Sequence, residues 1–175
     1  MKDLITESLT GAMSRLHAHA NLVGLPNTDE FTFRSFLIAE IMTRNPSAQC
    51  QTEWRRVDLL VQAKSRNALV ELKFYLYRRT IELDGEPGKP KGGPGPKNEG
   101  EFRDCVEKLR RFHWPGITDK FLVLVYEVGN PRKSRYSYDG SYDDLGQFGL
   151  DQTYKIGGPR RIKVVCRMAN IPPAT

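Results

Sequence analysis

The chain has 175 residues, of which 39% are hydrophobic and 27% charged, and its formal net charge of +6 favours polyanionic partners such as nucleic acid. This composition excludes a disordered chain, the lack of a long apolar run excludes a membrane span, and the length favours one domain with a full core. Three widely spaced cysteines without a CxxC pair argue against a disulfide framework and against a zinc site. The N-terminal segment carries acids, which argues against a secretory signal peptide, so we expect a cytoplasmic protein.

Helical spacing of apolar residues marks the segment before Pro26, and a clearer helix is predicted after it. Thr28 or Asp29 would cap this second helix, which runs to about Arg44. Its apolar stripe comprises Phe33, Phe36, Leu37, Ile41 and, at the margin, Met42. Glu40 lies at the edge of this buried face.

Three strands are predicted next, over 47–54, 55–62 and 68–77. Residues 63–67 form a hairpin-length connection between the second and the third strand. Period-two alternation in the third strand predicts one face with Val70, Leu72 and Phe74, and another with Leu69, Glu71, Lys73 and Tyr75. Acidic residues therefore fall inside segments that otherwise read as buried strands.

The second half of the core begins after a loop rich in glycine, proline and lysine over 84–98, which lacks the sequence of a nucleotide-binding P-loop. A helix over 101–112, a nearly continuous apolar strand over 120–128 and a last strand over 162–168 follow. The order of helix, three strands, helix and strand predicts an α/β fold, in which helices flank a mixed sheet.

Three charges in the two strongest strands need an explanation, since an isolated carboxylate is costly to bury. Asp58 could pair with Arg55, Arg56 or Lys73, and Glu71 and Lys73 could belong to a solvated strand face. However, a short hairpin brings Asp58 and Glu71 to the same end of the sheet, and Lys73 lies on the face of Glu71. Two converging carboxylates beside an ammonium group are typical of a site for a divalent cation such as magnesium.

These residues resemble the motif of the PD-(D/E)xK nuclease superfamily: Asp58 in RRVDLLV, Glu71-Leu72-Lys73 in VELKF, and a glutamate on the preceding helix, Glu40 in FLIAEIM. Val57 stands where the proline of the name would be. The predicted αβββαβ order is also the core order of this restriction-endonuclease-like family. The resemblance covers about residues 30–128 and implies a single nuclease-like domain over 1–175, with extensions at both ends of the core.

The resemblance implies a role for each residue of the motif. The implied metal ligands are Asp58, Glu71 and the backbone carbonyl of Leu72. Lys73 would position or activate the attacking water. Glu40 would contact the metal directly or through water, and Glu53 competes with Glu40 for this role. The implied cofactor is Mg²⁺, for which Mn²⁺ would substitute.

The implied activity is that of a metal-dependent endonuclease that hydrolyses phosphodiester bonds in DNA, in restriction, phage defence, junction resolution or repair. A homodimer or a partner protein would supply specificity, because one domain of this size offers little surface for reading sequence. The candidate phosphate-binding residues are Lys89, Lys91, Lys97 and Arg103, although the 84–98 loop could equally be a connector. The alternatives are an RNase, or a catalytically inactive module of the same fold that binds nucleic acid or protein.

Overall fold

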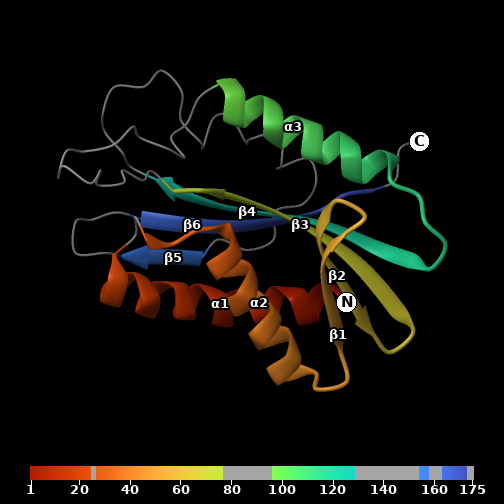
Figure 1. Ribbon diagram of the computed structural model, residues 1–175, viewed down its shortest axis with the longest axis horizontal. Coiled ribbons are helices and arrows are strands. Elements are labelled where there is room, and N and C mark those ends of the chain that lie inside the picture. The colour runs from red at the N-terminus through yellow and green to blue at the C-terminus, as the bar shows by residue number, and fades with distance from the viewer. Residues whose placement is uncertain (25–26, 77–95, 129–153, 158–162, 173–175) are drawn as a thin grey trace.

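The computed structural model describes residues 1–24, 27–76, 96–128, 154–157 and 163–172. Its helices in these ranges are α1 (Lys2–Val23), α2 (Glu30–Arg44) and α3 (Pro96–Arg111). Its strands there are β1 (Gln49–Trp54), β2 (Val57–Ala63), β3 (Arg66–Tyr75), β4 (Ile117–Val128), β5 (Tyr154–Gly157) and β6 (Lys163–Asn170). They form one mixed sheet, so the protein has an α/β fold (Figure 1). None of the helices in the described ranges is long and apolar enough to cross a bilayer.

The sheet combines an antiparallel meander with a parallel step. Its strand order is β1-β2-β3-β4-β6-β5, and β3 with β4 is the one parallel pair among the described strands. Parallel neighbours need a long crossover connection, and α3 lies between these two strands in the chain. The predicted succession of helix, three strands, helix and strand is therefore present from α2 to β4.

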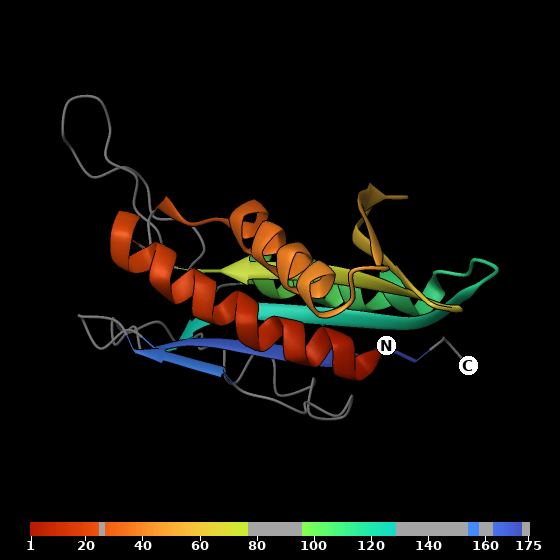
Figure 2. The same ribbon diagram turned by 90° about the horizontal axis from the view of Figure 1, so that it is seen from below.

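Helices cover both faces of the sheet (Figures 1 and 2). One face packs against α1 and α2, which lie side by side, and the other packs against α3. The alternation predicted for β3 is confirmed, because Val70, Leu72 and Phe74 pack with α1 and α2. Leu69 and Tyr75 pack on the opposite side with α3. The charged residues that alternate with the first set consequently belong to the α3 side.

The helix boundaries follow local chemistry. Asp29 caps α2, since its carboxylate accepts a hydrogen bond from the Thr32 backbone N–H at 2.7 Å. Met42, predicted at the margin of the apolar stripe, is instead 48% exposed, whereas Arg34 is buried. The helix α3 begins earlier than predicted, at Pro96, because proline fits the first turn of a helix, where its missing N–H has no partner to lose.

The connection between β2 and β3 is tighter than the predicted one over 63–67. Ala63 pairs with Arg66, so the turn consists only of Lys64 and Ser65. Lys64 has φ 54°, the left-handed backbone that matches a two-residue hairpin turn to the twist of its strands. This short turn fixes the register in which the acids of the two strands meet.

Candidate functional site

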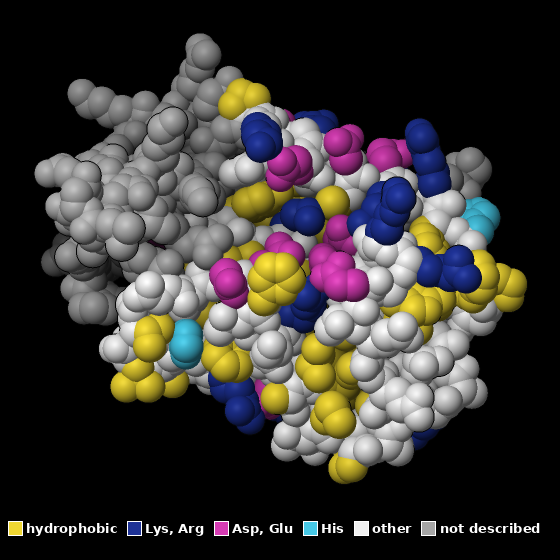
Figure 3. Space-filling view, viewed as in Figure 1, with side chains coloured by type: hydrophobic (Ala, Val, Ile, Leu, Met, Phe, Trp, Pro, Cys, Tyr) yellow, Lys and Arg dark blue, Asp and Glu magenta, His cyan; other side chains and the backbone are white. Residues whose placement is uncertain are grey.

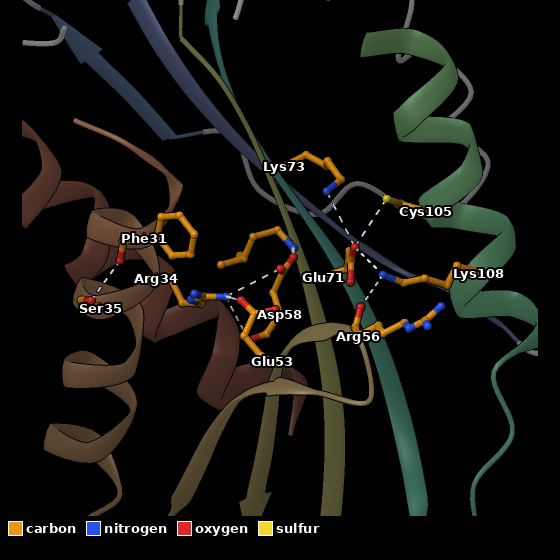
Figure 4. A network of polar contacts seen from close by, with 11 residues as sticks. Phe31, Arg34, Ser35, Glu53, Arg56, Asp58, Glu71, Lys73, Cys105 and Lys108 are labelled. Carbon is orange, nitrogen blue, oxygen red and sulfur yellow. Dashed lines mark hydrogen bonds and ion pairs between the residues drawn. The ribbon is translucent and has the colours of Figure 1, made fainter. Parts of the chain in front are cut away.

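Asp58 lies just before the first residue pair of β2 and β3, Leu59 with Val70. Its Oδ2 atom accepts a hydrogen bond from the backbone N–H of Leu72 at 2.7 Å. Its Oδ1 atom lies 3.7 Å from Nη1 of Arg34 on α2. The carboxylate thus acts as an acceptor for the backbone of β3 and is held between that strand and α2 (Figure 4).

Glu71 lies in the middle of β3 and is only 3% exposed. Its Oε1 atom accepts hydrogen bonds from Lys108 Nζ at 2.7 Å and Cys105 Sγ at 3.4 Å, both on α3. Lys73 Nζ lies 3.7 Å from the same oxygen (Figure 4). The other oxygen, Oε2, is buried and has no hydrogen-bond partner among the described residues. The alternative in which Glu71 lies on a solvated strand face is therefore wrong.

The charges of this cluster shift one another's pKa. Burial raises the pKa of Asp58 and Glu71 raises it further, although the Leu72 N–H and nearby lysines oppose both effects. Burial alone would lower the pKa of Lys73, but the surrounding carboxylates, Glu71 first, raise it. The site therefore holds a charged ammonium group beside the Asp58 carboxyl, whose ionisation is disfavoured by burial and by the charge of Glu71.

Glu30, the first residue of α2, belongs to the same group of charges. Its pKa is raised from 4.5 to about 7, chiefly by burial and then by the charge of Asp58, while Lys73 acts in the opposite direction. Glu71 raises it as well. The sequence analysis did not single out Glu30, because it precedes the apolar stripe of α2 by a full turn. Its position directly after the Asp29 cap was the one available signal.

Glu40 lies near the opposite end of α2, about 15 Å from Glu30 along the helix axis. Its Oε1 atom accepts a hydrogen bond from Arg15 Nε at 2.7 Å, and its Oε2 atom lies 3.5 Å from Arg44 Nη2. Gly11 of α1 leaves room for this carboxylate, because a Cβ atom there would lie 2.0 Å from Oε2. The structure therefore brings Glu30 to the acidic cluster and leaves the predicted Glu40 in an ion-pair network between α1 and α2.

Glu53, the other predicted candidate, is linked to the cluster through Arg34. The Arg34 guanidinium is buried and donates hydrogen bonds to the Glu53 carboxylate and, at 3.3 Å, to the backbone carbonyl of Asp58. The Glu53 side chain itself is 60% exposed. Among the described residues, the ion pair of Asp58 is thus made with Arg34, and not with Arg55, Arg56 or Lys73 as the structural alternative expected.

The four predicted phosphate-binding residues have different outcomes. Lys89 and Lys91 lie outside the described residues. The Lys97 side chain is 88% exposed and lies 3.8 Å from a carboxylate oxygen of Glu101, one turn away on α3. Arg103 is 59% exposed and bonds a glutamate one turn earlier at 3.1 Å. Acidic neighbours thus offset the charge of both described residues.

Helix α3 supplies two contacts that the sequence analysis did not assign to the site. Cys105 and Lys108 are three residues apart and so share one face of the helix, which passes over Glu71 (Figure 4). Burial raises the pKa of the Cys105 thiol to about 11, so it is neutral. Lys108 also donates to the backbone carbonyl of Arg56 at 2.8 Å. Lys108 thereby joins the turn after β1 to the acid on β3.

Acidic and basic side chains gather in the middle of the face shown in Figure 3, between α2 and α3. Within the described ranges, no group of three or more His, Cys, Asp and Glu residues is arranged to hold a metal ion. Asp58 and Glu71 remain as a pair of hard oxygen donors. One or two carboxylates are what Mg²⁺ takes from a protein, since it keeps its other positions for water and phosphate.

The chain gives no significant match to known proteins. No family model matches it, and neither a characterised protein nor a solved structure is significantly similar to it. Its function is therefore inferred from its own residues, above all from the two carboxylates and the ammonium group that β2 and β3 bring together.

Proposed function

We propose that the protein is a Mg²⁺-dependent endonuclease of PD-(D/E)xK type that hydrolyses phosphodiester bonds in DNA. The observation that carries this proposal is the hydrogen bond from the Leu72 N–H to Asp58, which holds one acid beside the residue that follows the other acid, Glu71. Lys73 adds an ammonium group 3.7 Å from Glu71. Burying charged groups is unfavourable unless each is paired. The gathering of these charges at one partly buried place therefore supports a functional role for them.

Asp58 and Glu71 would hold the metal, with the backbone carbonyl of Leu72 as a further contact. The donor set fits, because the buried Oε2 atom of Glu71 has no hydrogen-bond partner among the described residues and is open to a cation. When bound, Mg²⁺ or Mn²⁺ polarises the phosphate and lowers the pKa of a water molecule. Lys73, charged in this setting, would orient that water and stabilise the charge that develops on the phosphate.

Glu30 takes the assisting role that the sequence analysis gave to Glu40. A carboxyl group with a pKa of about 7 can accept a proton from water near neutral pH. Arg34 positions Asp58 through its buried guanidinium. Lys108 neutralises Glu71 while no metal is bound, because its ammonium group lies 2.7 Å from Oε1.

The wider setting follows from size and composition. A chain with a net charge of +6 is attracted to DNA, but one small domain reads little sequence by itself. We therefore propose that a homodimer or a partner protein supplies specificity, in the cytoplasm, in a process such as restriction, phage defence, junction resolution or repair.

The main alternative is a module of the same fold that binds nucleic acid without cleaving it. The contact of Lys108 with Glu71 favours this alternative, since such a pair could be purely structural. An RNase would share every feature of the site described above. Cleavage of DNA, cleavage of RNA or no cleavage distinguishes the endonuclease, the RNase and the binding module.

The deciding experiment is a cleavage panel of plasmid, linear, single-stranded and branched DNA, and RNA, with Mg²⁺, Mn²⁺ or EDTA. We expect metal-dependent cleavage of DNA by the wild type and none by Lys73→Ala. Glu40→Gln is the control, because this acid lies in the α1–α2 network. Cleavage of RNA alone would identify an RNase, and the absence of any cleavage would favour the binding module.

A further inference from the structure

A cluster of aromatic and cationic side chains lies where the turn between β1 and β2 meets the segment after α3. The guanidinium carbon of Arg55 is 3.6 Å from the centroid of the Trp114 ring and 5.4 Å from that of Trp54. The two indole rings are 5.9 Å apart and nearly perpendicular, at 84°. We call Trp54, Arg55 and Trp114 the Trp–Arg platform.

The platform is open to solvent although its parts are suited to burial. Trp114 is 44% exposed, and Arg55 is exposed as well. Phe112 packs beside the platform, with its ring centroid 5.9 Å from that of Trp54. In the part of the chain that the structure describes, neither Arg55 nor the neighbouring Arg56 forms an ion pair. The exposed indole ring of Trp114, beside guanidinium groups with no acidic partner in the described ranges, is a surface for a ligand that is both flat and anionic.

The backbone of the turn between β1 and β2 sets the position of Arg55. Glu53, Arg55 and Arg56 have φ values of 53°, 48° and 67°, in the left-handed region that residues with a Cβ atom seldom adopt. Trp54 pairs with Val57, so Arg55 and Arg56 form a two-residue hairpin turn, and positive φ at both residues is the conformation that such a turn favours. Here they project the side chain of Arg55 onto the indole ring of Trp114.

The turn that carries Arg55 is joined to the candidate site by one ammonium group. Lys108 Nζ donates to the Arg56 carbonyl at 2.8 Å and to Glu71 Oε1 at 2.7 Å. Along the chain, Asp58 follows Arg55 by three residues, which span at most about 10 Å. This upper bound is comparable to the length of a few stacked nucleotides, which rise by about 3.4 Å each in one strand.

We propose that the Trp–Arg platform stacks unpaired bases of the DNA strand that enters the Asp58–Glu71 site, so that the substrate is single-stranded DNA or DNA with an unpaired segment. Aromatic rings and arginine bind the flat face of any base, and alanine substitution of such a ring costs a measurable fraction of affinity. The internal bases of an intact duplex are already stacked on one another, so only its two end pairs offer a free face. That the bound strand is cleaved rests on the proposed nuclease function, whereas the stacking of bases does not require cleavage.

Intrinsic fluorescence reports on this surface, because the chain has two tryptophans and both belong to the platform. In EDTA, the wild type is titrated with a thymidine oligonucleotide and with a blunt duplex of two fully complementary strands of the same length. We expect the single strand to quench the tryptophan emission and the duplex to leave it nearly unchanged. If neither quenches, the proposal is overturned and the platform is left to a protein partner.

Variants then test which side chains cause the preference, with affinity measured by anisotropy of a labelled oligonucleotide. Trp114→Ala should weaken binding of the single strand at least about fivefold without changing duplex binding, and Trp114→Phe should restore most of the affinity. The matched control for Arg55→Ala is Arg111→Ala, because Arg111 is an exposed arginine paired with Glu107 on α3. Only Arg55→Ala should reduce the preference for the single strand.

The outcomes separate this proposal from the nuclease function. Thermal melts identify a misfolded variant, and if Trp114→Ala fails to fold, Trp114→Phe and Arg55→Ala still decide the question. Equal losses for single strand and duplex, or no loss in either, would overturn base stacking even if the wild type cleaves DNA. Conversely, a selective loss of single-strand binding in a protein that cleaves nothing would uphold the platform and overturn the nuclease.

Discussion

The two ends of α2 carry acids in opposite electrostatic settings. Glu40, near the C-terminal end, faces Arg15 on α1 and Arg44 on its own helix, so positive groups surround it. Glu30, at the N-terminal end, faces other acids, and its pKa is raised to about 7 by burial and by the charge of Asp58. The charge of Glu40 is thus neutralised by arginines, whereas burial and neighbouring acids disfavour the charged form of Glu30.

This difference separates a structural role from a chemical one. An acid held by two arginines stabilises the packing of two helices and gains little from any further ligand. An acid crowded with Asp58 and Glu71 repels their charges, and a cation or a proton would relieve that repulsion. The comparison predicts that substitutions at the two ends of α2 differ in their effect on activity, on metal binding and on pH dependence.

The largest expected effect comes from removing the charges next to Glu30. Asp58→Ala, Glu71→Ala and Lys73→Ala should each lower the cleavage rate at least about 1,000-fold, and double variants should lose little more, because residues that act as a unit are not additive. Single-turnover cleavage of the best substrate in the panel measures this. A Lys73→Ala protein with near-normal activity would show that the proposed mechanism is wrong.

A matched pair of variants tests the comparison directly. Glu30→Gln should lower the cleavage rate by about 10- to 100-fold, the usual cost of losing a group that supports a metal site. Glu40→Gln should keep the wild-type rate and lose about 1 kcal/mol of stability or less, because it only weakens ion pairs with partly exposed arginines. The reverse ranking of the two rates would return the assisting role to Glu40.

Metal binding should appear as a shift in melting temperature. With Mg²⁺ or Mn²⁺ at about 100 times its dissociation constant, the wild type should melt roughly 5 to 10 °C higher than in EDTA. Asp58→Asn should melt above the wild type in EDTA, since burial and Glu71 disfavour the charged form of Asp58, and it should lose most of the metal shift. A destabilised variant, with a wild type that is equally insensitive to metal, would identify Asp58 as half of a structural ion pair with Arg34.

The smallest expected effect concerns pH in the absence of metal. The pKa of Glu30 is about 7 in the folded protein against an ordinary value of 4.5, so the folded state keeps a proton that the unfolded chain releases. Its contribution to stability is complete below pH 4.5 and is lost as the pH rises to about 7. Glu30→Gln should therefore flatten the fall in melting temperature across this window. Glu40→Gln should follow the wild type, and identical curves for all three proteins would contradict the assignment.

Local patterns determined most of the elements. Alternation along 68–77 predicted which residues of β3 face each side of the sheet, because side chains of a strand alternate by geometry. The same rule and a short hairpin put Asp58, Glu71 and Lys73 together, and the structure brings them together. These relations involve neighbouring segments, so no long-range information was needed.

Only the tertiary structure decided which other residues reach the acids. Glu30 and Glu40 both border the buried side of α2, and periodicity cannot tell which end of the helix approaches β2. The contact of Lys108 with Glu71 depends on the path of α3 across the sheet, because the two residues are far apart in the chain. Arg34 falls on the buried face of α2, where the pattern predicts an apolar residue, and only the packed structure supplies the carboxylates that make its burial favourable.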